Sequence, residues 1–207
     1  MAACVGLASP LAACANHSDI VQIGSLLYQK ITGGDSEGIT RSQADAVPYA
    51  TLGVRLGSSG EAMFVLGSKS GSDLQWVGGT RFAIATRDGR ILRTTGFVHN
   101  LTGFLEQTPA VRSAAGVHDY SYDLADLNAY GIAVRCSERD AGRERIVIVA
   151  VAHLTSHVIE DCSAPQLDWR FSDEFWKDAA TNAVWRSVQY VHPGLDPITT
   201  ETLRPAS

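Results

Sequence analysis

The sequence predicts a mainly β protein in which an N-terminal amphipathic helix precedes an antiparallel, β-barrel-like or strongly curled sheet of about ten strands. From Tyr49 onward, short runs of β-branched and aromatic residues are separated by Gly, Ser, Asp and Asn at intervals of roughly ten residues. A sheet of about ten strands tends to curl or to split, so we expect a barrel or a sandwich.

The chain opens on a nearly uncharged apolar run that ends in Leu11-Ala12-Ala13-Cys14. As a helix, the run is too short to cross a hydrocarbon core of about 30 Å, but it suits the apolar region of a signal peptide. We therefore assign residues 1–13 to a signal peptide. No Lys or Arg precedes Cys14, so either the true start lies upstream or the segment is an apolar N-terminus with an incidental cysteine.

Small residues followed by a cysteine resemble the lipobox of bacterial lipoproteins, in which the cysteine is acylated and becomes the mature N-terminus. The resemblance implies lipidation of Cys14. Several acyl chains on one residue anchor a protein firmly, because each buried methylene contributes about 0.8 kcal/mol. Ala15 and Asn16 place no aspartate after the cysteine, which resembles lipoproteins sorted to the outer membrane.

Residues 14–48 are predicted to hold the lipidated N-terminus, a helix and a linker. Ser18 is a candidate N-cap, and apolar residues recur at helical spacing from Ile20 to Ile31 before Gly33-Gly34 ends the pattern. Residues 49–207 are predicted to form one antiparallel β domain, in which 98–107 and 111–117 are helix or long loop. The predicted strands are 50–56, 62–67, 73–78, 81–86, 91–95, 119–123, 129–138, 143–159, 167–177, 183–191 and 198–204.

Charge and hydropathy exclude two classes of protein. The formal net charge of −5 comes without a basic stripe, so nucleic acid is not an expected partner. After Cys14 the strongest apolar run, Ile146 to Leu154, has the length of a strand and not of a membrane-spanning helix. The body of the protein is therefore expected beside a membrane.

Cys136 and Cys162 are the two cysteines that follow Cys14. In an oxidising compartment, an even pair of cysteines can close as a disulfide. The alternative is two buried unpaired thiols, and the sequence leaves both open.

Three tryptophans are candidate glycan contacts, because aromatic rings stack on sugar rings: Trp76, Trp169 and Trp185. Their alternative role is to build the core, since aromatic residues at alternating strand positions are often buried.

Candidate acid and base groups for a polysaccharide hydrolase are Asp119, Asp123 and Glu174, whose alternative role is that of solvated surface carboxylates. His153 and His157 would lie about 13 Å apart on a strand, so no metal site is predicted.

Three segments resemble the YjbF/GfcB family of lipoproteins, which are encoded with group 4 capsule and exopolysaccharide genes. They are 50–57 (ATLGVRLG), 89–97 (GRILRTTGF) and 184–190 (VWRSVQY), the last continuing through 193–197 to 203–205. Trp76, which precedes the middle segment, also matches the family pattern. The chain departs from the family pattern at His192, where glycine is more usual, and at Phe97, where leucine is common.

The resemblance implies a β-barrel-like lipoprotein on the periplasmic face of the outer membrane that assists production or export of capsule or extracellular polysaccharide. It implies no catalytic residue and no cofactor. The expected partners are the membrane, through the lipid, and polysaccharide-export proteins or the glycan. The alternatives are a periplasmic glycan-binding barrel and, less favoured, a polysaccharide-modifying hydrolase.

Overall fold

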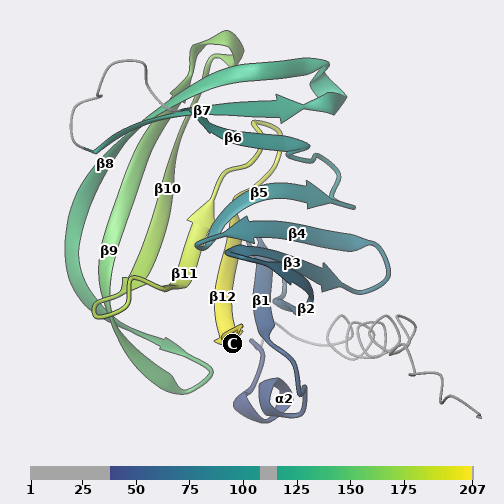
Figure 1. Ribbon diagram of the computed structural model, residues 1–207, viewed down its shortest axis with the longest axis vertical. Coiled ribbons are helices and arrows are strands. Elements are labelled where there is room, and N and C mark those ends of the chain that lie inside the picture. Colours follow the sequence, from purple (N-terminus) through teal and green to yellow (C-terminus); the bar gives the residue numbers. More distant parts are fainter. Residues whose placement is uncertain (1–37, 108–115, 207) are drawn as a thin grey trace, which may run out of the picture.

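A single antiparallel sheet of twelve strands makes up most of the protein (Figure 1). The computed structural model describes residues 38–107 and 116–206. Neighbouring strands follow the order β5-β4-β3-β2-β1-β12-β11-β10-β9-β8-β7-β6. The strands are β1 (Thr51–Leu56), β2 (Ala62–Ser70), β3 (Asp73–Gly78), β4 (Phe82–Arg87), β5 (Arg90–Thr95), β6 (Gly103–Gln107), β7 (Val117–Leu124), β8 (Ala129–Ile148), β9 (Val151–Ala164), β10 (Trp169–Asp178), β11 (Val184–Gln189) and β12 (Ile198–Arg204).

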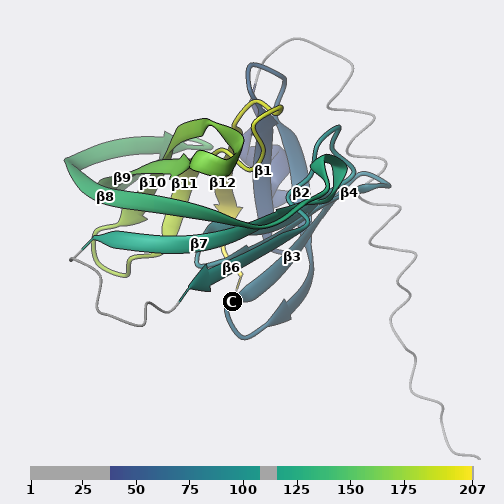
Figure 2. The ribbon, with the colours of Figure 1, turned by 90° about the horizontal axis from the view of Figure 1, so that it is seen from above.

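The sheet curls until its two edge strands, β5 and β6, approach each other, so that it forms a nearly closed barrel (Figure 2). The backbone N–H of Thr94 donates to the carbonyl of Leu101 at 2.9 Å, and the Thr94 hydroxyl accepts from the N–H of Leu101 at 3.0 Å. No ladder joins β5 to β6 in the described sheet. We call the line along which these edges face each other the seam. The predicted curled, mainly β architecture is confirmed.

Three parts of the predicted strand map are wrong. The predicted break between the strands 129–138 and 143–159 does not exist, because β8 runs from Ala129 to Ile148. The predicted strand 143–159 contains a hairpin turn at Val149-Ala150, where β8 ends and β9 begins. This turn was missed because it lacks the Gly, Asn or Asp that usually marks a tight hairpin. The segment 98–107, predicted as helix or long loop, contains the short edge strand β6, which pairs only with β7.

Short helices occur at the ends of the strands. The helix α2 (Arg41–Asp45) begins at a capping box, in which Thr40 and Gln43 satisfy each other's backbone N–H groups. Two 3₁₀ turns, η1 (Ala125–Leu127) and η2 (Pro165–Leu167), connect β7 to β8 and β9 to β10. Within the described ranges, no helix is long and apolar enough to cross a membrane. The predicted helix over 18–32 and Cys14 lie outside the described residues.

Two apolar clusters hold the sheet in this shape. The interior core is formed by side chains that alternate inward along the strands, as the two-residue period of a strand requires. A second group, which we call the outer cluster, packs on the opposite face under α2. Its buried members are Ile39, Ala44, Val47, Met63, Val65, Ile146, Ile148, Trp176 and Leu203.

β8 changes face at a bulge, and it therefore contributes to both clusters. The register with β9 shifts between Asp140 and Gly142, and Gly142 has a φ of 96°. One extra residue turns the following side chains to the other face of a strand. Cys136 accordingly lies in the interior core, whereas Ile146 and Ile148 lie in the outer cluster.

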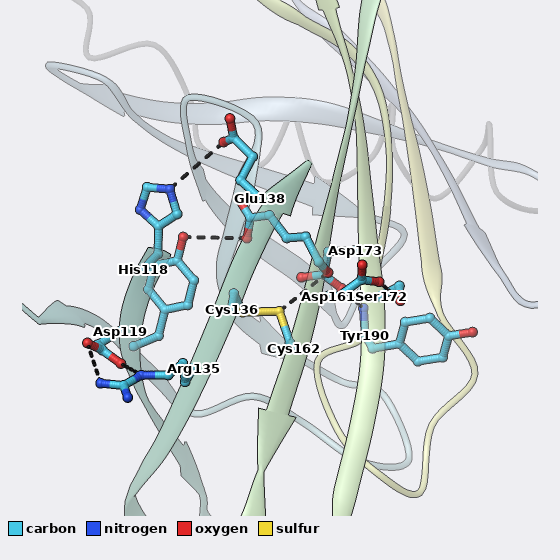
Figure 3. Close-up of a disulfide and its surroundings, with 12 residues drawn as sticks. His118, Asp119, Arg135, Cys136, Glu138, Asp161, Cys162, Ser172, Asp173 and Tyr190 are labelled. Carbon is cyan, nitrogen blue, oxygen red and sulfur yellow. Dashed lines mark hydrogen bonds and ion pairs between the residues drawn. A yellow bond between two sulfur atoms is a disulfide. The ribbon is translucent and has the colours of Figure 1, made fainter. Parts of the chain in front are cut away.

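Cys136 on β8 and Cys162 on β9 face each other and are joined by a disulfide, with their Cα atoms 4.0 Å apart (Figure 3). Both side chains are buried in the interior core. Of the two alternatives that the sequence left open, the structure contains the bonded pair.

We expect reduction of this disulfide to lower the free energy of unfolding by roughly 3 kcal/mol, because the bond closes a loop in the unfolded chain. The two cysteines are 26 residues apart in sequence. Urea denaturation with and without reductant would measure the loss. The variant C136A/C162A is the control, since reductant should not destabilise it further. Equal stability of the native protein in both conditions would contradict the expectation.

Candidate functional site

A cleft of about 210 Å³ lies at the seam between the β4–β5 turn and the ends of β6, β7 and β10. It combines buried aromatic and charged groups with an exposed charged rim. The residues that line it are Arg87, Asp88, Arg90, Leu92, Phe104, Glu106, His118, Tyr120, Glu138, Glu160, Phe175 and Lys177. We call this feature the seam cleft.

The floor of the seam cleft is a buried ion-pair network that crosses the barrel. Arg90 begins β5, and its Nη2 lies 2.5 Å from a carboxylate oxygen of Glu160 on β9. Its Nη1 lies 3.5 Å from a carboxylate oxygen of Asp173 on β10. The three side chains are 15%, 5% and 1% exposed, so water screens these charges little. One edge of the sheet is thereby tied to its opposite wall.

Aromatic rings surround the Arg90 guanidinium. Its central carbon lies 4.7 Å from the ring centroids of Tyr120 and Phe175 and 5.8 Å from that of Phe104. The negative faces of aromatic rings attract such a cation, most strongly where water is excluded. Burial alone would lower the pKa of Arg90, but the neighbouring acidic groups, chiefly Glu160, Tyr120 and Asp173, together outweigh it and the pKa is raised. Arg90 is therefore a fixed cation.

Asp173 is the second carboxylate beside a single guanidinium, and it is the more deeply buried of the two. Burial raises the pKa of Asp173 to about 7, although Arg90 and the backbone N–H of Tyr190 act in the opposite direction. That N–H donates to the Asp173 carboxylate at 2.8 Å (Figure 3). Asp173 does not line the cleft, so near neutral pH it is the buried network beneath the cleft that can hold or release one proton.

The start of β5 is fixed in place by a buried amide on β11. Gln189 accepts from the backbone N–H of Ile91 and donates to the carbonyl of Gly89, both at 2.9 Å. Gly89 has a φ of 82°, and a Cβ there would lie 2.4 Å from the Cβ of Val184. Glycine is therefore required at this position by both backbone conformation and packing.

The rim of the seam cleft carries charges of both signs. Lys177 lies 4.0 Å and His118 3.8 Å from the carboxylate of Glu138. Over the whole lining, three cations (Arg87, Arg90 and Lys177) face four carboxylates (Asp88, Glu106, Glu138 and Glu160). This near balance does not favour a polyanion. It suits a polar ligand that can both donate and accept hydrogen bonds.

The three candidate tryptophans lie away from the seam cleft. Trp76 and Trp169 are buried in the interior core, and Trp76 Nε1–H donates to the Thr86 hydroxyl at 2.9 Å. Trp185 is half-buried, its Nε1–H donates to Asp178 at 3.0 Å, and its ring centroid lies 3.9 Å from that of His153. Of the three, only Trp185 keeps a partly exposed ring.

The three candidate carboxylates for hydrolysis are not brought together, and each has a partner of its own. Asp119 pairs with Arg135 at 2.7 Å, and Asp123 accepts from the backbone N–H of Gly131 at 2.8 Å. Glu174, on the distant strand β10, pairs with His157 at 2.8 Å. None of the three lines the seam cleft.

Within the described ranges, one His-Asp-His group has ligand atoms within 4.8 Å of one another: His99, Asp126 and His192. The backbone N–H of Gly194 donates to His192 Nδ1 at 2.9 Å. In a neutral imidazole, Nε2 then carries the proton and has no lone pair for a metal. Since His99 also hydrogen-bonds Asp126 at 2.6 Å, the group connects three loops and does not form a ready metal site.

The seam cleft depends on residues that sequence reasoning did not select as a site, chiefly Arg90, Glu160 and Asp173. These lie far apart in the chain and meet only because β5 closes against β9 and β10. Arg90 lies within the GRILRTTGF segment, which was the one available signal.

The family model "Group 4 capsule polysaccharide lipoprotein gfcB, YjbF" matches residues 25–203. The chain belongs to this family. It is 28% identical over 184 residues to the "Uncharacterized lipoprotein GfcB" of Escherichia coli (strain K12), covering 83% of this chain and 85% of that protein. Its fold is similar to the crystal structure of the hypothetical lipoprotein YmcC from Escherichia coli (K12), with a TM-score of 0.70 and 21% identity. That match covers 94% of this chain and all of the other.

We expect Asp173 to make the protein less stable as the pH rises from about 4 to about 7. The folded protein binds this proton more tightly than the unfolded chain, because the pKa rises from 3.8 to about 7 on folding. The stabilisation is complete below the pKa of the unfolded chain, 3.8, and is lost as the pH rises through the pKa of the folded protein, about 7. The slope contributed by one group is at most about 1.4 kcal/mol per pH unit.

Urea denaturation between these pH values would measure the slope for the native protein and for Asp173→Asn. The variant keeps an acceptor for the Tyr190 N–H but cannot ionise, so its stability should depend less on pH. Asp161→Asn is the control, because hydrogen bonds from Ser172 and Arg139 hold the pKa of that exposed carboxyl below its ordinary value. Identical slopes for the native protein and Asp173→Asn would refute the assignment.

Proposed function

We propose that the protein is an outer-membrane-anchored periplasmic lipoprotein that assists production or export of a capsule or extracellular polysaccharide without catalysing a reaction. Family membership over residues 25–203 is the observation that carries the proposal. The Leu11-Ala12-Ala13-Cys14 segment supports lipid anchoring, and Ala15-Asn16 supports the outer membrane as the destination. The barrel would contact an export protein or the glycan.

The arrangement of carboxylates supports a role other than hydrolysis. Glycosidases place two carboxyl groups on either side of one bond, about 5 to 9.5 Å apart. Asp119, Asp123 and Glu174 each have a structural partner and do not converge. In the seam cleft, Glu160 forms a buried ion pair with Arg90, so this carboxylate has a structural role.

The proposal predicts that a deletion strain makes less extracellular polysaccharide and that the native protein restores the amount. Cys14→Ser should not restore it, because the barrel would no longer be held at the membrane. The assay is the quantity of extracellular polysaccharide per cell, with immunoblots showing equal abundance of both proteins. If Cys14→Ser restored the polysaccharide, the function would not require the lipid anchor. If deletion did not change the amount of polysaccharide, the proposed role in its production or export would be wrong.

The seam cleft favours glycan binding as the way in which the barrel takes part. Its rim offers Glu106 and Lys177 as hydrogen-bond partners for hydroxyl groups, beside the half-buried ring of Phe104. The rigid floor places these groups without requiring much reorganisation when a ligand binds. The near balance of charge suits a neutral or zwitterionic saccharide more than a polyuronate.

Isothermal titration with fragments of the host's own polysaccharide would measure this binding. We expect E106Q/K177Q to weaken it at least tenfold, because both changes remove charge-assisted hydrogen bonds from the rim. The matched control is D119N/R135Q, which removes one exposed acid and one exposed base from a pair outside the cleft. No heat at millimolar fragment, or equal losses in both variants, would exclude the cleft as the glycan site.

A further inference from the structure

Exposed aliphatic side chains gather at the tip of the β8–β9 hairpin. Val147 is 57% exposed, Leu154 is 51% exposed and Val151 is 43% exposed. All three belong to the nine-residue apolar run Ile146 to Leu154. A cluster of exposed apolar side chains on a protein surface indicates an interaction site more than isolated ones do. We call these residues, together with the Val149-Ala150 turn, the hairpin tip.

Val147 and Leu154 lie on one face of the hairpin, whereas Val151 pairs with Ile148 and shares its face, beside the turn. That second face packs against the barrel, so the hairpin tip is held in a fixed position. Ile146 and Ile148 are buried in the outer cluster. The guanidinium of Arg186 donates to the carbonyl of Val147 at 3.3 Å, and Trp176 Nε1–H donates to the Glu144 carboxylate.

The turn of the hairpin tip retains apolar residues where other residues would be more stable. Val149 has a φ of 42° and Ala150 a φ of 68°. Asn-Gly is the favoured pair for such a turn, and a left-handed conformation is strained for a β-branched valine. Val149 packs against the outer cluster, so tertiary packing holds this strained turn in place and the end of the hairpin stays apolar.

Two cations share the face of β8 that carries Val147, and one of them, Arg145, lies directly across from Leu154. Arg143 and Arg145 are exposed on β8, and neither has an acidic partner among the described residues. By contrast, Arg139, further along the same strand, pairs with Asp161 at 2.9 Å. An apolar end followed by free guanidinium groups matches an anionic phospholipid surface, with the apolar groups below the headgroups and the cations among them.

The path of the chain favours a lipid surface over a protein partner. The protein belongs to a family of lipoproteins. The described part of the chain begins at residue 38, just before α2, and α2 packs in the same outer cluster as the hairpin tip. Both lie at the lower end of the molecule in Figure 1.

We propose that the hairpin tip inserts into the interfacial region of an anionic phospholipid membrane, as a second attachment that orients the barrel relative to the bilayer. Val147, Val151 and Leu154 enter the interface, and Arg143 and Arg145 pair with lipid phosphates. This inference does not depend on polysaccharide binding or export.

Vesicle cosedimentation would test it with the chain from residue 14 onward carrying Cys14→Ser, so that no acyl chain contributes. Vesicles of phosphatidylethanolamine and phosphatidylglycerol should bind this protein more tightly than vesicles of phosphatidylcholine, and added salt should weaken the binding. In the same background, V147T/L154T should bind the anionic vesicles at least tenfold more weakly, while threonine preserves strand propensity. R143Q/R145Q should abolish the preference for anionic lipid.

The matched control is V98T/L105T, which removes two exposed apolar side chains far from the hairpin tip and should bind like the parent. Far-ultraviolet circular dichroism would show that all variants are folded. Absence of binding by the parent, or equal binding by V147T/L154T, would overturn the proposal. If the parent ignores vesicles while V147T/L154T impairs polysaccharide output in cells, the tip serves a protein partner and the lipid assignment fails.

Discussion

The buried ion pair between Arg90 and Glu160 is the interaction on which the arrangement of the barrel depends. A sheet whose edges are not joined by a ladder can open along its seam. Here the first residue of an edge strand reaches across the interior to the opposite wall, and aromatic rings exclude water around it. Removing one partner of such a pair leaves an uncompensated buried charge, at a cost of about 3 to 5 kcal/mol. Closure is thus maintained by a few polar groups as well as by the apolar core.

The same network explains why a cleft forms at the seam. Arg90 holds the start of β5 inward, β6 pairs only with β7, and no ladder closes the seam beyond the contact of Thr94 with Leu101 in the described sheet. Asp173 adds a second carboxylate beside a single guanidinium, and burial raises its pKa because Arg90, which also pairs with Glu160, compensates only in part. The network beneath the cleft is therefore held rigidly but is sensitive to protonation.

The fold could be predicted from the sequence because local signals determine it. Alternation and regular turn spacing predicted the curled antiparallel sheet, and most strands lie where they were expected. The Val149-Ala150 turn was missed because tertiary packing, and not turn chemistry, imposes it. The seam cleft could not be predicted, since Arg90 and Glu160 are 70 residues apart and meet only on closure. Trp76 and Trp169 lie in the interior core and not on a glycan-binding surface. Their rings point inward from the strands, and the curl of the sheet that forms the barrel buries them.

The β8–β9 hairpin connects the two regions to which we assign functions. Glu138 lines the seam cleft and Val147 lies at the hairpin tip, nine residues further along β8. At about 3.3 Å per residue, the strand separates them by roughly 30 Å at most. The disulfide joins the two strands at the cleft end, and the bulge at Gly142 turns the far end onto the outer cluster. If the hairpin tip lies at the membrane, this hairpin sets the height of the cleft above the bilayer. Lipidation of Cys14 alone would fix a single point of the chain at the membrane, whereas a second attachment at the hairpin tip would also define the orientation of the barrel.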